Sequence, residues 1–103
     1  MGFRVELHPG AKEDLDSLDP SVRRDVTKRI DVLSENPFIG KPLGNVMGIN
    51  LTGYYKLYAA RKRYRIVYHL VGNCLEIVEI VGIGKRERSE IYKIVAKRLF
   101  NKN

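Results

Sequence analysis

The chain has 103 residues, of which 44% are hydrophobic and 30% are charged, a balance that is ordinary for one globular domain. No apolar run approaches the roughly 18 residues of a membrane span, and the first residues alternate instead of forming the apolar block of a signal peptide. We therefore expect a single domain over residues 1–103 that is cytoplasmic and does not associate with a membrane.

The net charge of +7 is carried by one half of the chain. Residues 1–50 hold seven Lys and Arg against eight Asp and Glu, whereas residues 51–103 hold twelve against four. This asymmetry predicts a positive face that attracts a polyanion, and nucleic acid is the commonest candidate. A membrane surface fits less well, because no predicted helix pairs a basic face with bulky aromatic residues.

The first half of the chain is predicted to form one strand and two helices. Phe3–His8 alternates apolar and polar side chains, which is typical of a half-buried strand. A helical pattern begins at Ala11, and Asp19-Pro20 is expected to end that helix and to cap and open the next one. The second helix is expected over about Ser21–Glu35. Residues 38–52 follow no period and predict a long loop.

The second half of the chain is predicted to form three strands and a closing helix. Alternation returns over Tyr54–Ala59 and Tyr64–Leu70, and an apolar run spans Leu75–Val81. The connections are short enough for an antiparallel meander. We expect an α+β fold in the order strand, two helices, three strands, helix: an antiparallel sheet with two N-terminal helices and a C-terminal helix.

The segment after the third predicted strand combines glycines, cations and a helix. Gly82 and Gly84 are expected to break the strand, and three cations follow within a four-residue window, Lys85, Arg86 and Arg88. The helical spacing that comes next predicts that Tyr92 borders an apolar stripe and faces the basic turn at the surface. The residues of that stripe are Ile91, Ile94, Val95 and Leu99.

Cations and tyrosines share faces of two predicted strands. A period of two places Lys56 and Tyr58 on one face of the first strand, and Arg65 with His69 on one face of the second. In an antiparallel pair these faces can coincide. A set of Lys, Arg and Tyr side chains can bind a phosphodiester, stabilise the charge that develops on it, and move a proton with a phenol or an amine.

The sequence offers no pattern for several other chemistries. The one cysteine, Cys74, cannot form an internal disulfide, and two distant histidines give no metal-ligand spacing. No glycine-rich phosphate loop and no Ser-His-Asp context is recognisable. We expect neither a metal nor a cofactor.

Three segments carry a specific resemblance to a known family: Tyr55–Leu57, Tyr64–Tyr68 and Gly84–Tyr92. They resemble the signature of RelE toxins in the RelE/ParE superfamily of bacterial toxin–antitoxin systems, and the likeness covers almost the whole chain in element order. It implies a type II toxin that enters the ribosomal A site and cleaves mRNA without metal, by 2′-hydroxyl attack that leaves a 2′,3′-cyclic phosphate. It also implies two partners, a cognate antitoxin and the ribosome with its mRNA and rRNA.

Carried over residue by residue, the resemblance implies catalytic roles for Lys56, Arg65, Arg86 and Tyr92. A phenol with a pKa of about 10 is ionised only to about one part in a thousand at neutral pH, so a phenolate base needs nearby cations. Where RelE toxins of the founding type carry a second lysine, this chain has Tyr58, a candidate for stacking on a base. Contacts to RNA are expected from the other cations of the two basic turns, Arg61, Lys62, Arg63, Lys85 and Arg88.

Two other functions stay open on the sequence. A ParE-like toxin of the same fold inhibits DNA gyrase by binding and needs no ribonuclease residues, and a plain RNA-binding module would bind without cleaving. The joint occurrence of Lys56, Arg65, Arg86 and Tyr92 favours the ribonuclease.

Overall fold

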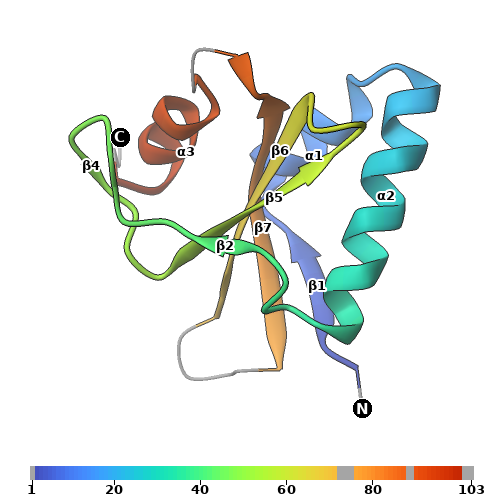
Figure 1. The fold of residues 1–103 in the computed structure, drawn as a ribbon, viewed down its shortest axis with the longest axis horizontal. Helices are drawn as coiled ribbons and strands as arrows, with labels where there is room; N and C mark the ends of the chain where they lie inside the picture. Colours follow the sequence, from blue (N-terminus) through green and yellow to red (C-terminus); the bar gives the residue numbers. More distant parts are fainter. Residues whose placement is uncertain (1, 72–75, 88–89, 101–103) are drawn as a thin grey trace.

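The computed structural model describes residues 2–71, 76–87 and 90–100 (Figure 1). Cys74 and the predicted RNA contact Arg88 lie outside these residues. The α+β class, with two N-terminal helices and a C-terminal helix, is confirmed. The elements are β1 (Arg4–Leu7), α1 (Pro9–Asp16), α2 (Pro20–Glu35), β2 (Lys41–Pro42), β3 (Asn45–Val46), β4 (Ile49–Asn50), β5 (Tyr54–Ala59), β6 (Tyr64–Leu70), β7 (Ile77–Lys85) and α3 (Glu90–Phe100).

Five strands form one sheet in the order β1-β7-β6-β5-β2, and β3 and β4 form a separate two-stranded hairpin. The predicted antiparallel meander of β5, β6 and β7 is confirmed, and β5 and β6 have the predicted bounds. β1 joins the sheet parallel to β7, with Val5 opposite Val78. This pairing was not predicted, because the alternation of a four-residue strand carries no information about its partner.

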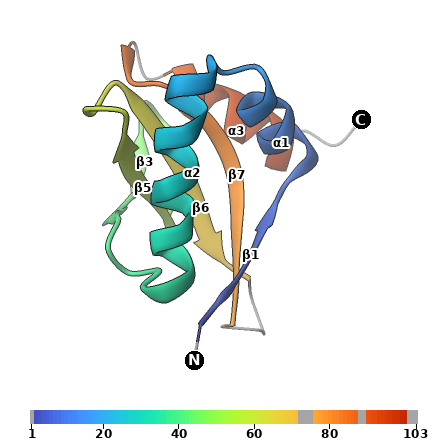
Figure 2. The same cartoon turned by 90° about the vertical axis from the view of Figure 1, so that its right-hand side faces the viewer.

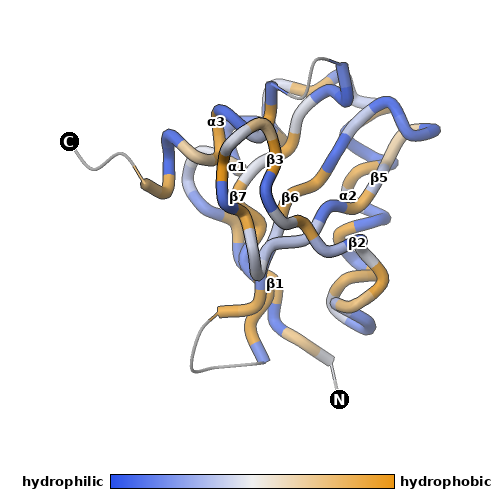
Figure 3. Tube along the Cα trace, turned by 60° about the vertical axis from the view of Figure 1, so that its left-hand side comes forward, coloured by the Kyte–Doolittle hydropathy of each residue, from blue (hydrophilic) through white to orange (hydrophobic). Residues whose placement is uncertain are grey.

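The sheet separates two hydrophobic clusters, and its two faces are covered by different helices (Figure 1). α1 and α2 cover a core that includes Val26, Leu33, Ile66 and Tyr68. Figure 2 looks onto these two helices, and Figure 3 shows hydrophobic residues along β7, which lies between β1 and β6. On the other face, α3 packs against buried Val67 and Val81 of the sheet. None of the helices in the described ranges is long and apolar enough to cross a membrane.

The helix starts differ in detail from the prediction. α1 begins at Pro9, two residues before the predicted start, and His8 caps it because its Nδ1 accepts a hydrogen bond from the Gly10 N–H at 3.0 Å. Asp19 precedes α2 as predicted, but its side chain makes no capping hydrogen bond. The predicted end of α2 at Glu35 is confirmed.

The segment predicted as a loop, residues 38–52, contains β2, β3 and β4. Each of these strands has two residues, which is too short to show a period of two. The entry to the segment is held by Tyr68, whose hydroxyl donates to the Pro37 carbonyl at 2.7 Å and accepts from the Gly40 N–H at 3.0 Å.

The prediction that the strand ends before the two glycines is wrong. β7 continues through Gly82 and Gly84 to Lys85. A Cβ on Gly82 would lie 2.6 Å from Cγ2 of Val95 and 3.0 Å from Cδ1 of Ile91. The glycines are therefore needed because α3 lies directly on the strand at this point, and they do not interrupt the strand.

α3 buries Ile91, Val95 and partly Leu99 of the predicted stripe, but its buried face is turned toward Tyr92 and away from Ile94. Ile91, Tyr92 and Val95 are buried, whereas Ile94 is 42% exposed. The predictions that Ile94 belongs to the buried stripe and that Tyr92 lies at the surface are both wrong. Ile91 and Val95 fill the space above the two glycines of β7, which turns the helix so that position 92 faces the sheet.

An ion pair ties α3 to α1 and β7. The two terminal nitrogens of Arg98 donate to the Asp14 carboxylate at 2.8 and 2.9 Å, and the Ile83 N–H donates to the same carboxylate at 3.0 Å. Both charged side chains are 19% exposed, so the bidentate pair is largely shielded from water. It fixes the position of α3 and therefore of Tyr92.

Candidate active site

Side chains from β5, β6 and the segment after β7 converge on Tyr58, on the sheet face that α3 covers. The β5–β6 register places Tyr58 opposite Arg65, so both side chains lie on one face, and Lys56 lies two residues earlier on that face. The predicted coincidence of the two faces is confirmed. Arg86 follows β7, and its N–H donates to the Arg63 carbonyl at 2.9 Å, which holds it beside the β5–β6 hairpin.

Three cations surround the Tyr58 ring. Lys56 Nζ donates to the Tyr58 hydroxyl at 3.2 Å and lies 5.2 Å from the ring centroid. The guanidinium carbons of Arg65 and Arg86 lie 5.9 and 5.4 Å from the same centroid. The hydrogen bond from Lys56 is the largest cause and lowers the pKa of Tyr58; burial, the second largest, opposes it, and Arg65 adds smaller effects that lower the pKa further. This phenol ionises more readily than an ordinary tyrosine.

Tyr92 of α3 contacts Arg65 from within the apolar cluster on this face of the sheet. The Arg65 guanidinium carbon is 5.0 Å from the Tyr92 ring centroid, so Arg65 contacts the rings of both Tyr58 and Tyr92. Tyr92 is 2% exposed and Arg65 is 8% exposed. Burial raises the pKa of Tyr92, and the positive charge of Arg65 offsets only part of that rise. The structure thus brings all four predicted catalytic residues together. The phenol that ionises more readily, however, is that of Tyr58 and not that of Tyr92.

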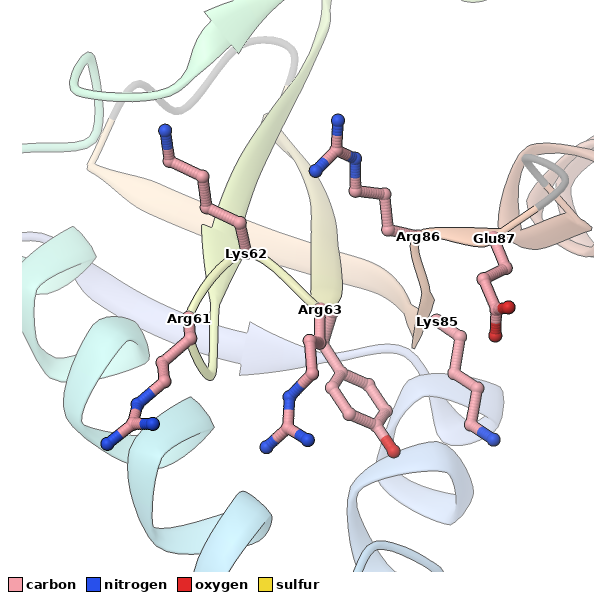
Figure 4. Close-up of a pocket in the computed structure, with 7 residues that line it drawn as sticks. Arg61, Lys62, Arg63, Lys85, Arg86 and Glu87 are labelled. Carbon is pink, nitrogen blue, oxygen red and sulfur yellow. The ribbon is translucent and has the colours of Figure 1, made fainter.

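The tip of the β5–β6 hairpin borders an open groove of about 700 Å³ (Figure 4), lined by Arg61, Lys62, Arg63, Tyr64, Lys85, Arg86 and Glu87. Figure 4 shows that the five labelled cations do not all point the same way. Lys62 and Arg86 point to one side of the strands, whereas Arg61, Arg63 and Lys85 point to the opposite side. Because Arg86 contacts the Tyr58 ring, Lys62 is the hairpin cation on the side of the Tyr58 cluster.

Two residues, Lys41 and Tyr58, have a larger place in this site than their sequence patterns indicate. Lys41 of β2 pairs with Lys56 of β5, and cross-strand partners share a face, so Lys41 adds a cation to the Tyr58 side of the sheet. No sequence signal identified it, because β2 has only two residues. Tyr58 had a signal, its period-two spacing from Lys56, but the spacing alone does not reveal that three cations surround it.

The chemistry of this arrangement follows from its charges. Two guanidinium groups and an ammonium group can together bind the oxygens of one phosphodiester, and a phenol beside them can exchange a proton. Within residues 2–71, 76–87 and 90–100, no group of three or more His, Cys, Asp and Glu side chains is placed to hold a metal ion.

Known proteins resemble this chain over nearly its full length. A family model described as the ParE toxin of type II toxin–antitoxin system, parDE, matches residues 5–90. The chain is 28% identical over 99 residues to a putative RelE-like toxin protein of Escherichia coli, and 27% identical over 99 residues to the mRNA interferase toxin RelE of Escherichia coli strain K12. Each of these matches covers 96% of this chain and 99% of the relative.

Solved structures agree with the sequence relatives. A mutant of the E. coli toxin RelE in the free state superposes with a TM-score of 0.75 at 26% identity, covering 96% of this chain and 99% of that one. A chain of the toxin–antitoxin complex RelBE2 from Mycobacterium tuberculosis superposes with a TM-score of 0.68 at 27% identity, covering 84% and 100%. The chain therefore belongs to the ParE toxin family of type II toxin–antitoxin systems, and within that family it is a RelE-type toxin.

Proposed function

We propose that this toxin is an endoribonuclease that cleaves mRNA in the A site of the translating ribosome. The observation that carries the proposal is the placement of Lys56, Arg65 and Arg86 around one phenol, at 5.2, 5.9 and 5.4 Å from its ring centroid. Relatives at 27% identity are named mRNA interferases, which supports the same activity.

The proposed reaction is a transesterification within the RNA, assisted by these side chains, with solvent water as the source and the acceptor of protons. The 2′-hydroxyl attacks the adjacent phosphate, a 2′,3′-cyclic phosphate forms, and the 5′-oxygen leaves as a hydroxyl. Negative charge accumulates on the phosphoryl oxygens as the attack proceeds, and Arg65 and Arg86 are suited to donate to two of these oxygens. Lys56 adds a third positive charge at the same place. Arg86 is exposed and can meet RNA from solvent, whereas Arg65 is held by the ring of Tyr92.

The flanking cations are proposed to bind the RNA backbone. Lys62 lies on the same side of the strands as Arg86, which supports a contact between Lys62 and a phosphate next to the one that reacts. Arg61, Arg63 and Lys85 extend the positive surface around the hairpin tip, and Arg88 continues the predicted set along the chain.

Two partners follow from the proposed function. The ribosome presents the mRNA and rRNA, which implies a cytoplasmic location. A cognate antitoxin is the second partner, because similar solved structures include RelBE2 from Mycobacterium tuberculosis and the RelE toxin of E. coli bound to an antitoxin peptide.

Primer extension on a translated message tests the proposal. Adding the protein should produce new ends within codons at the A site, and Arg86→Ala should reduce their rate of appearance by about 100-fold or more, because a donor to the transition state is lost. Lys28→Ala is the matched control, since Lys28 is an exposed cation on α2 and its loss changes the net charge equally.

A DNA gyrase supercoiling assay belongs to the same experiment, since the matching family model is described as a ParE toxin. Inhibition of supercoiling by the protein without any mRNA cleavage would overturn the ribonuclease proposal in favour of a gyrase inhibitor. Binding to ribosomes without cleavage would leave only the RNA-binding module.

A further inference from the structure

We propose that Tyr58 is the catalytic residue that takes the proton from the 2′-hydroxyl, and that Tyr92 is a positioning residue that holds Arg65. This assignment rests on the proposed ribonuclease function and names the proton acceptor within it. It gives different roles to two phenols whose rings both contact the Arg65 guanidinium.

Tyr58 has the contacts that a phenolate requires. Its hydroxyl accepts a hydrogen bond from Lys56 Nζ at 3.2 Å, a contact that becomes stronger when the oxygen is charged. Arg65 and Arg86 add positive charge beside the same ring. Tyr58 is only half-buried, so a substrate can approach it.

The backbone at Tyr58 is held firmly. Its carbonyl lies near the end of β5, beyond the short pairing with β2, and accepts a hydrogen bond from Arg29 Nε of α2 at 3.2 Å. Pairing with Arg65 of β6 fixes the other edge of the strand. A proton acceptor on a paired strand keeps a constant distance to the cations that bind the phosphate.

Tyr92 has the opposite surroundings. It is 2% exposed and belongs to the apolar cluster with Leu51, Val67 and Ile91. Burial raises its pKa, so its phenol is less readily ionised than an ordinary one. What Tyr92 offers is a ring 5.0 Å from the Arg65 guanidinium carbon, a cation–π contact that sets where the cation points.

The proposed step balances without a co-reactant. The Tyr58 phenolate takes the proton of the 2′-hydroxyl, the 2′-oxygen forms a bond to phosphorus, and the bond between phosphorus and the 5′-oxygen breaks. The departing 5′-oxygen takes a proton from solvent, which reaches the exposed Arg86 side of the cluster. Loss of the Tyr58 proton to solvent afterwards restores the phenolate.

Single-turnover cleavage of a ribosome-bound message distinguishes the roles. Tyr58→Phe should cleave at least about 100-fold more slowly, the usual contribution of a positioned acid or base. Tyr92→Phe keeps the ring that holds Arg65 and should cleave faster than Tyr92→Leu, which loses that ring; equal rates in these two variants would contradict the positioning role. Tyr55→Phe is the matched control: it removes one hydroxyl from the same strand, on the other face, where Tyr55 stacks on Tyr68.

The dependence of the cleavage rate on pH is a second measurement. If Tyr58 had only a structural role, the pH at which the rate levels off would not depend on its pKa. The wild-type rate should rise with pH and level off at the lowered pKa of Tyr58, and the plateau should shift to higher pH in Lys56→Met, which loses the main cause of that lowering. Unfolding in urea shows that each variant is folded.

If Tyr58→Phe cleaves as fast as the wild type, this assignment is overturned while the ribonuclease function stands. If the wild type does not cleave, both the assignment and the proposed function are overturned.

Discussion

Tyr58 and Tyr92 carry the same phenol, and their surroundings move the two pKa values in opposite directions. Tyr58 accepts a hydrogen bond from an ammonium group, which favours the charged form. Tyr92 lies in apolar packing, which favours the neutral form. Arg65 contacts both rings, so the cation that we propose as a ligand for the phosphate also packs against the buried cluster.

The raised pKa of Tyr92 predicts a loss of stability at alkaline pH. In the unfolded chain tyrosine ionises near its ordinary pKa of 10.0, whereas the folded protein keeps Tyr92 neutral to higher pH. The contribution of Tyr92 to stability is therefore fully present below pH 10 and is lost as the pH rises beyond it, because the unfolded state ionises first. Tyr92→Phe should reduce this alkaline loss, measured as the drop in urea midpoint between pH 7 and about pH 11. An equal drop in both proteins would contradict the prediction.

At the scale of elements, the contact between β7 and α3 decides the shape of the site. The two glycines of β7 let Ile91 and Val95 lie against the strand, and the pair of Asp14 with Arg98 holds the far end of the helix. Together these contacts turn Tyr92 toward Arg65. The cations of β5 and β6 thus depend on a helix that meets them only in the folded chain.

Gly82→Ala tests this contact. The added Cβ would lie 2.6 Å from Cγ2 of Val95, so α3 must shift, at a cost of roughly 1–3 kcal/mol in the free energy of unfolding. The shift should also displace the Tyr92 ring and lower the cleavage rate. Gly44→Ala is the control, since no atom lies within 4 Å of a Cβ at that position and its urea midpoint should be unchanged. Equal midpoints for the two variants would argue against a tight helix–strand contact.

At the scale of the whole molecule, the positive charge belongs to the C-terminal half, and the fold gathers part of it at one end of the sheet. The hairpin tip and the segment after β7 come together because Arg86 N–H bonds to the Arg63 carbonyl. Lys41 joins the same face from the N-terminal half, through its pairing with Lys56. A polyanion therefore meets charges drawn from distant parts of the chain.

Association with ribosomes should weaken steeply as salt increases, because each phosphate contact releases bound counterions. Lys62→Ala should reduce the slope of log affinity against log salt by about 0.7–0.9, the value for one contact. Lys28→Ala, which removes an exposed cation from α2, should leave the slope unchanged. The measurement is sedimentation with ribosomes over a range of salt concentrations, and a salt-independent affinity would exclude an electrostatic contact.

The sequence by itself determined the parts that depend on local periodicity. The bounds of β5 and β6, the end of α2 at Glu35 and the shared face of Lys56 and Arg65 follow from a period of two, a proline and an antiparallel pairing. The uneven charge was also visible in the sequence. These features need no information beyond neighbouring residues.

Only the tertiary structure decided which phenol the cations surround. The rotation of α3 depends on space left by glycines in another element, and the parallel pairing of β1 depends on a partner about seventy residues away in the chain. The spacing of apolar residues within α3 does not decide whether Ile94 or Tyr92 faces the sheet. Packing against β7 decides it, so that Tyr92 is buried and Ile94 is exposed. The pKa of a phenol is set by the groups that folding brings within a few ångströms, so its role is decided in three dimensions.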